Sequence, residues 1–450
     1  MGSPFRKLPI MDGLYNWAWV EARVAETSEA WKQCASDRLP DAPSFSVGEQ
    51  RKREKAYDEG LHAVERELKR ARGNRTAAGR HETQQRVTTM FARFSAAALD
   101  LNDDAIDLLT HDFLPAGTRL GRWARQFDPE LSMPDIIQAC RNAWTACGLQ
   151  PLMGERVELT PSILGYSLLY PYTDNYLDGA DISVDAKLGF SRRFRKRLQG
   201  ETLAAENERE VTLWALVELI ERQYPRARYP DVFDCLLAIH LAQEHSIAQV
   251  KSQCSEAELL PVSCAKGGTS VLADACMARG WLNEEESRFA FDWGVLLQLG
   301  DDLQDVREDM QRGSMTLFSG PAAPGRGLDD KVIQLLTFSE RVSDRMERMP
   351  HGTATLKALL RMSWRSLILM AVAESHQYFS PVFLKEAERF SPFRFEFLRK
   401  RREKLTGRRG LYAMLFDAMV EPIETEDAGL PLPASRNTLS PCVSPQLPAA

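Results

Sequence analysis

The stretch from Ala290 to Arg312 (AFDWGVLLQLGDDLQDVREDMQR) joins an apolar half to an acidic half in one predicted helix. The apolar half suits a helix buried in a core. The acidic half places Asp301, Asp305 and Asp309 four residues apart, so they share one helix face, and Asp302 lies beside Asp305 at the three-residue spacing. Burying repelling carboxylates is costly unless a cation neutralises them. Two interpretations follow: a solvated acidic helix end, or a site for hard divalent cations such as Mg²⁺.

Helical periodicity recurs along almost the whole chain, and strand signals are nearly absent. We therefore predict an all-α fold. Residues 1–84 are expected to form an N-terminal helical extension packed on the core, and residues 85–420 one all-α domain. Residues 421–450 are rich in proline and lack apolar periodicity, which predicts a disordered tail.

Composition narrows the function classes. The net charge of −6 is not that of a nucleic-acid-binding protein, so no nucleic acid partner is expected. The eight cysteines include no CxxC pair, which favours reduced thiols in a cytoplasmic protein. No apolar run approaches the roughly 18 residues that a membrane-spanning helix needs.

A second acidic cluster ends another apolar segment, YSLLYPYTDNYLDGADIS at 166–183. Asp174 and Asp178 are four residues apart in it. Two carboxylate rows that face each other could hold several cations between them, which one surface cluster cannot do. The ligand that requires several Mg²⁺ ions in apolar surroundings is a diphosphate with a hydrocarbon tail.

The two rows resemble those of the class I isoprenoid synthase superfamily: trans-prenyl diphosphate synthases, terpene cyclases and squalene/phytoene synthases. LLQLGDDLQD is similar to the second aspartate-rich motif of that superfamily. DNYLD is similar to the first motif, with Asn175 at its second position. AKGGTSVLADA at 265–275 resembles the lysine-bearing helix of prenyl synthases, which implies that Lys266 touches the diphosphate beside a helix break at Gly267–Gly268.

The resemblance implies an isoprenoid synthase helical bundle, with two facing Asp-rich helices around a central cavity. It implies an allylic prenyl diphosphate as substrate and Mg²⁺ as cofactor. The expected catalytic residues are Asp174, Asp178, Asp301, Asp305 and Lys266, and the expected metal ligands are Asp174, Asp178, Asp301, Asp302, Asp305 and Asp309.

Basic residues elsewhere offer further diphosphate ligands. Arg192 and Lys196 follow the first acidic cluster, and Arg408 lies in the basic run at 393–412. Arg192 and Lys196 belong to a first basic run, at 187–197, and Arg408 to a second, at 393–412. Either run could instead be a solvated helix face. The second could also contact an anionic membrane, so peripheral membrane contact is left open, as is a homodimer.

The reaction itself has three interpretations. No GGKR-like segment, which holds isopentenyl diphosphate in prenyl synthases, occurs in the chain, and this favours terpene cyclisation. Prenyl chain elongation or head-to-head coupling is the alternative, because the DDxxD form of the second motif belongs to that branch. A non-catalytic protein that binds prenyl diphosphates is the third, supported by Asn175 and by Pro171, which is expected to kink the first motif's helix.

Overall fold

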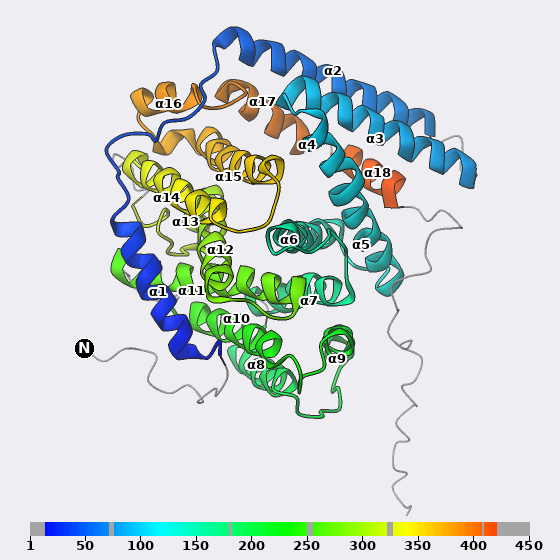
Figure 1. The fold of residues 1–450 in the computed structure, drawn as a ribbon, viewed down its shortest axis with the longest axis vertical. Helices are drawn as coiled ribbons and strands as arrows, with labels where there is room; N and C mark the ends of the chain where they lie inside the picture. The colour runs from blue at the N-terminus through cyan, green and yellow to red at the C-terminus, as the bar shows by residue number, and fades with distance from the viewer. Residues whose placement is uncertain are drawn as a thin grey trace, which may run out of the picture.

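The structure is a computed structural model that describes residues 14–71, 76–179, 182–249, 255–321, 327–406 and 409–420. All regular secondary structure in these ranges is helical, which confirms the predicted all-α class (Figure 1). The elements, including one π-helical turn (η1) and one 3₁₀ turn (η2), are α1 (Trp17–Lys32), α2 (Val47–Ala71), α3 (Ala77–Leu99), α4 (Asp103–Asp107), η1 (Leu108–Phe113), α5 (Leu114–Phe127), α6 (Met133–Leu152), α7 (Pro161–Asp178), α8 (Val184–Leu198), α9 (Glu208–Gln223), α10 (Pro230–Gln249), α11 (Glu256–Arg279), α12 (Glu284–Gln304), α13 (Val306–Arg312), α14 (Asp329–Glu347), α15 (Ala354–Glu374), η2 (His376–Tyr378), α16 (Pro381–Glu388), α17 (Phe395–Thr406) and α18 (Arg409–Val420).

Helix α11 is the centre of the bundle and packs against α1, α6, α7, α10 and α12. Its N-terminus has a capping box, in which the Ser255 hydroxyl and the Glu258 carboxylate each bond the other residue's backbone. Its C-terminus ends at Gly280, whose positive φ of 90° suits a glycine. Between these caps the helix is buried on nearly every side, as expected of a helix with apolar and small residues all round.

The contact between α11 and α12 depends on facing glycines. A Cβ added to Gly267 would lie 2.5 Å from the Gly294 carbonyl oxygen, and one added to Gly268 would lie 2.5 Å from the Phe291 ring. These glycines therefore let two helix backbones approach closely. The expected helix break at Gly267–Gly268 is wrong, because α11 runs through both residues without interruption.

Helix α7 runs antiparallel to α11. The Ser162 hydroxyl donates to the Met277 carbonyl, and further along α7 the Tyr166 hydroxyl donates to the Ser270 carbonyl. The C-terminal end of α7, which carries the first acidic cluster, therefore lies towards the N-terminal half of α11.

Helix α12 is antiparallel to α11 as well. Gly294 in its middle meets Gly267, and Asp302 near its C-terminus accepts a hydrogen bond from Ser263, one turn before Gly267. The acidic ends of α7 and α12 consequently lie at the same end of α11.

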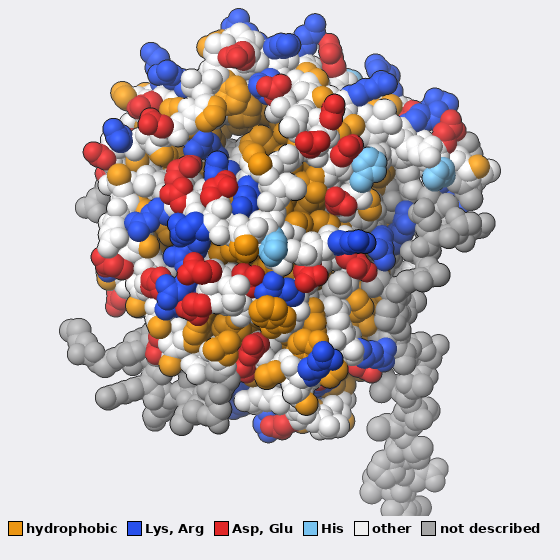
Figure 2. Space-filling model, in the orientation of Figure 1, with side chains coloured by type: hydrophobic (Ala, Val, Ile, Leu, Met, Phe, Trp, Pro, Cys, Tyr) orange, Lys and Arg blue, Asp and Glu red, His pale blue; other side chains and the backbone are white. Residues whose placement is uncertain are grey.

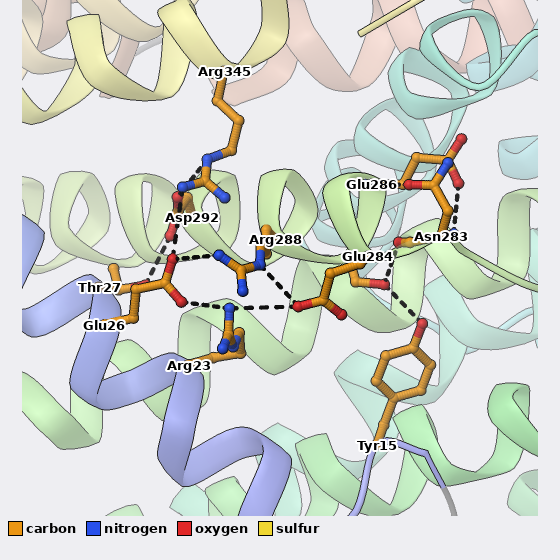
Figure 3. Close-up of polar contacts among 11 residues, drawn as sticks. Tyr15, Arg23, Glu26, Thr27, Asn283, Glu284, Glu286, Arg288, Asp292 and Arg345 are labelled. Atoms are coloured by element: carbon orange, nitrogen blue, oxygen red, sulfur yellow. Dashed lines mark hydrogen bonds and ion pairs between the residues drawn. The ribbon is translucent and has the colours of Figure 1, made fainter. Parts of the chain in front are cut away.

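The N-terminal helix α1 is fixed to α12 and α14 by charged side chains (Figure 3). Thr27 Oγ1 donates to Asp292 Oδ1 at 2.7 Å, and Arg345 Nε pairs with Asp292 Oδ2 at 3.2 Å. Arg288 Nη1 also pairs with Glu26 at 2.9 Å. Burial raises the pKa of Asp292, while the nearby Arg345 and the Thr27 hydrogen bond oppose that rise.

Helices α2 and α3 lie side by side at the edge of the bundle and contact α18 (Figure 1). The Gln84 side chain donates to the carbonyls of Ala418 and Met419 in α18. Because α3 runs from Ala77 to Leu99, the expected boundary between residues 84 and 85 falls inside this helix. The expected tail, 421–450, lies outside the described residues.

Two surface properties bear on the expected partners. Among the described helices, none combines the length and the apolarity that crossing a bilayer requires. On the face shown in Figure 2, Lys and Arg side chains are interspersed with Asp and Glu. Mixed charge of this kind does not concentrate a positive field for an anionic polymer on that face.

Candidate functional site

The acidic row at the end of α12 forms as its spacing predicts. The Asp305 backbone amide donates to the Asp301 carbonyl, and the Asp309 amide donates to the Asp305 carbonyl, each at 2.9 Å. Asp305 ends α12 with φ −92° and ψ 5°, and α13 begins at Val306. The three carboxylates therefore follow one another along a nearly continuous helix that bends at its middle member.

Each carboxylate of the row resists ionisation. Desolvation raises the pKa of Asp305, and the Asp301 charge beside it raises that pKa further. Desolvation, followed by repulsion from Asp305, raises the pKa of Asp309 to about 6. The carboxylates at 305 and 309 are thus each destabilised in their charged form by desolvation and by a neighbouring carboxylate, and a bound cation would relieve that repulsion.

Asp302 differs from its neighbours because it points into the protein. Its carboxylate accepts hydrogen bonds from Ser263 Oγ at 3.0 Å and from Gln298 Nε2 at 2.8 Å. Burial raises its pKa to about 7, although both hydrogen bonds and the Lys266 charge oppose the rise. Asp302 was predicted as a metal ligand, and in this structure it links α11 to α12.

Two cationic side chains adjoin the row. The charge of Lys266 on α11 opposes the rise in the pKa values of Asp301, Asp302 and Asp309, so Lys266 lies near enough to the acidic row to interact with it. Arg141 on α6 pairs with Asp301 at 3.1 Å, and both side chains are about half exposed. Sequence reasoning missed Arg141, because nothing near it in the chain marks it as part of a site.

The first cluster has other contacts. Asp174 Oδ1 accepts a hydrogen bond from Gln243 on α10 at 3.3 Å, and Asn175 donates to Asp135 on α6 at 2.7 Å. Asp178 is the last residue of α7, and its side chain lies outside the described part of the structure. Helix α6 therefore contacts both acidic clusters, Asn175 through Asp135 and Asp301 through Arg141.

A small cavity of about 30 Å³ lies beside the first cluster, between α7, α8 and α10. Thr173 and Gln243 are among the residues that line it, together with apolar and aromatic side chains. Its volume corresponds to about one water molecule. A second cavity, of about 10 Å³, lies between Leu39 and Leu369. Neither can hold a hydrocarbon tail, so the expected central cavity stays a prediction.

The predicted basic ligands on α8 are surface residues. Arg192 and Lys196 are exposed, and Lys196 pairs with Glu201 at 3.7 Å. The remaining arginines of this run pair with glutamates: Arg193 with Glu206 and Glu210, Arg195 with Glu244, and Arg197 with Glu221. Most of the run is thus neutralised within the protein. Arg408 lies outside the described residues.

A third acidic segment, DDAID at 103–107, repeats the DDxxD spacing of Asp301, Asp302 and Asp305. It forms α4, which is capped by Asn102, and Asp103, Asp104 and Asp107 are all exposed. Helix α4 packs on α15, which in turn packs on α12. The DDxxD spacing is the sequence signal that identifies this segment. Unlike the other two acidic clusters, the segment does not follow a long apolar run.

Among the described residues, no three His, Cys, Asp or Glu side chains converge closely enough to form a metal site unaided. Comparisons of the chain with protein-family models, with curated proteins and with solved structures found no match.

Proposed function

We propose that this protein is a Mg²⁺-dependent class I isoprenoid synthase that ionises an allylic prenyl diphosphate, with terpene cyclisation as the first choice of reaction. One observation carries the proposal. The carboxylate row ends the buried, apolar helix α12, and the row lies beside the two cations Lys266 and Arg141. Carboxylates that can bind metal, next to cations that can bind phosphate, are the parts that diphosphate ionisation requires.

The side chains of the row provide the carboxylate oxygens that Mg²⁺ prefers as ligands. Mg²⁺ prefers oxygen ligands, and it is commonly held by one or two carboxylates together with water and substrate phosphates. Asp301 and Asp305 are exposed carboxylates that can provide this, so convergence of three protein ligands is not required. When bound, the ion would neutralise the negative charge that develops on the departing diphosphate.

The remaining roles fall to the protein's own side chains. Lys266 and Arg141 would bind diphosphate oxygens, and Arg141 would exchange its contact with Asp301 for one with the substrate. Donors fixed before reaction stabilise a leaving group without paying for reorganisation. Lys266 directly precedes Gly267 on α11, and the close packing of α11 on α12 through glycines fixes the Lys266 backbone relative to the helix that carries the row.

A non-catalytic protein that binds prenyl diphosphates is the second candidate. The engagement of Asn175, at the second position of the first motif, with Asp135 favours it. Chain elongation and head-to-head coupling remain alternatives within the enzyme class, since they use the same ionisation step.

Turnover assays distinguish these functions. The full-length protein would be incubated with geranyl, farnesyl or geranylgeranyl diphosphate, with and without isopentenyl diphosphate, and with Mg²⁺ or with a chelator. Cyclisation predicts Mg²⁺-dependent release of diphosphate and a hydrocarbon or alcohol product without isopentenyl diphosphate. Longer prenyl diphosphates formed only with isopentenyl diphosphate would indicate elongation. Binding without turnover of any substrate would establish the second candidate instead.

A further inference from the structure

Two cysteine sulfurs lie unusually close together in the core. Cys235 on α10 and Cys276 on α11 have an Sγ–Sγ distance of 2.8 Å, and both side chains are fully buried. A disulfide bond is about 2.04 Å long, so the two sulfurs are roughly 0.8 Å from bonding distance. The two helices pack directly on each other, which fixes the thiols as neighbours.

We propose that Cys235 and Cys276 form an intramolecular disulfide bond when the protein is exposed to a peroxide, and that this bond joins α10 to α11. Other thiols face oxygen atoms: Cys34 Sγ contacts the Ala30 carbonyl, and Cys140 Sγ contacts the Gly117 carbonyl. The Cys235–Cys276 pair differs from these thiols because each of its sulfurs faces another sulfur.

The chemistry balances with hydrogen peroxide as oxidant. One sulfur, as its thiolate, attacks a peroxide oxygen, the O–O bond breaks, and hydroxide leaves to give a sulfenic acid. The second sulfur attacks the sulfenic sulfur, so that the S–S bond forms and the S–O bond breaks. The two thiol protons end in water. Overall, two thiols and one peroxide give one disulfide and two waters, with two electrons passing to the peroxide.

Burial determines how this site behaves. A fully buried pair is reached only when the fold opens locally, and a hydrogen peroxide molecule, little larger than water, needs a smaller opening than bulkier reductants do. The oxidised pair should therefore form slowly and persist in the folded protein. The bond would restrict α10, whose Gln243 contacts Asp174, relative to α11, which carries Lys266.

Peptide mapping tests the proposal directly. The full-length protein would be treated with hydrogen peroxide, unfolded with an alkylating agent and digested with trypsin without reductant. Cys235 and Cys276 are the sole cysteines of the tryptic peptides 229–251 and 267–279, so their disulfide gives one defined cross-linked species. We expect this species to dominate, and the thiol titre in denaturant to fall from eight to six. Alkylated, unlinked 229–251 and 267–279, or other cross-links in equal yield, would overturn the proposal.

Two variants provide matched controls. Cys235→Ser should abolish the cross-linked species, and no other disulfide that contains Cys276 should replace it. Cys147→Ser removes another fully buried thiol, on α6, and should leave the cross-link intact. Oxidised wild-type protein should also melt a few degrees higher than reduced protein, because the bond restricts the unfolded chain. Equal melting of the two forms, despite the cross-link, would contradict the joining of α10 to α11 in the native fold.

Discussion

Arg141 Nη2 donates a hydrogen bond to Asp301 Oδ1 across 3.1 Å, which connects α6 to the acidic end of α12. Desolvation raises the pKa of Asp301, and the Arg141 charge is the largest influence that opposes this rise. Without a metal ion, this guanidinium is thus a principal counter-ion of the first carboxylate in the row. A cation that binds Asp301 has to compete with it.

Replacing Arg141 should therefore strengthen the response to Mg²⁺. In Arg141→Gln the cation no longer displaces a guanidinium, so the rise in melting temperature caused by Mg²⁺ alone should exceed that of the wild type. The loss of a half-exposed pair should itself cost only about 0–1 kcal/mol. Arg222→Gln, which breaks the exposed pair with Glu218 on α9, is the control and should respond like the wild type. An unchanged Mg²⁺ response in Arg141→Gln would contradict competition at Asp301.

Asp305→Asn tests whether the row binds a metal–diphosphate complex. A ligand that binds only the folded state adds about 2.7 kcal/mol at a hundredfold excess over Kd. The wild type should melt clearly higher with Mg²⁺ and inorganic diphosphate together than with either alone. Asp305→Asn should lose most of this rise without lowering the stability of the unliganded protein, because it removes a repelling charge.

Asp344→Asn, at an exposed position on α14, is the matched control and should retain the full rise. If Mg²⁺ and diphosphate do not raise the melting temperature of the wild-type protein, the proposed metal site is excluded.

Lys266→Ala should slow diphosphate ionisation by roughly 10- to 100-fold, the scale for losing one preorganised electrostatic contact. The measurement is single-turnover release of diphosphate, with circular dichroism to verify that the helices remain. Lys400→Ala, which removes the exposed pair with Glu396 on α17, should turn over at the wild-type rate. Equal rates in Lys266→Ala and the wild type would exclude Lys266 from the site.

Asp302 should make stability depend on pH. Its pKa is about 7 in the folded protein and about 4 when unfolded, so its contribution is present below pH 4 and is lost as the pH rises towards 7. Between these values the free energy of unfolding should fall by up to about 1.4 kcal/mol per pH unit relative to Asp302→Asn. Urea unfolding of both proteins at pH 5 and pH 7 measures this difference. If the free energies of unfolding of the two proteins change with pH in parallel, folding does not raise the pKa of Asp302.

The glycine contact predicts opposite effects for two substitutions in α12. A Cβ on Gly294 would overlap the Gly267 carbonyl, so Gly294→Ala should destabilise the protein by about 1–3 kcal/mol or prevent folding. No atom lies within 4 Å of a Cβ on Gly300 in the same helix, and Gly300→Ala should stabilise by up to about 1 kcal/mol. Urea unfolding compares them; a tolerated Gly294→Ala would mean that the helices can separate at little cost.

The sequence allowed the all-α class and the ladder of Asp301, Asp305 and Asp309 to be predicted, because both follow from local periodicity. The role of Gly267 and Gly268 could not be predicted in the same way. Paired glycines are compatible with a helix break and with close helix packing, and only the position of Gly294 on the partner helix decides between them. Tertiary contact thus overrode the local preference of glycine.

Arg141 was missed for a related reason. It belongs to a helix without an acidic or glycine-rich motif, and its partner is 160 positions away in the chain. Asp302 shows the same limit, since its spacing places it beside the row, whereas Ser263 on α11 holds its carboxylate inwards. Periodicity predicts which residues share a helix, but the neighbouring helices determine where each side chain points.

The attachment of α1 has a consequence for producing parts of this protein. Glu26 and Thr27 contact Arg288 and Asp292 on α12, the helix that ends in the acidic row. A fragment that begins at residue 85 would expose the apolar face left by Trp31 and would deprive Asp292 of a hydrogen-bond donor. We therefore expect a fragment that retains α1 to be more stable than one that begins at residue 85, although the residues of α1 are remote in the chain from every acidic cluster.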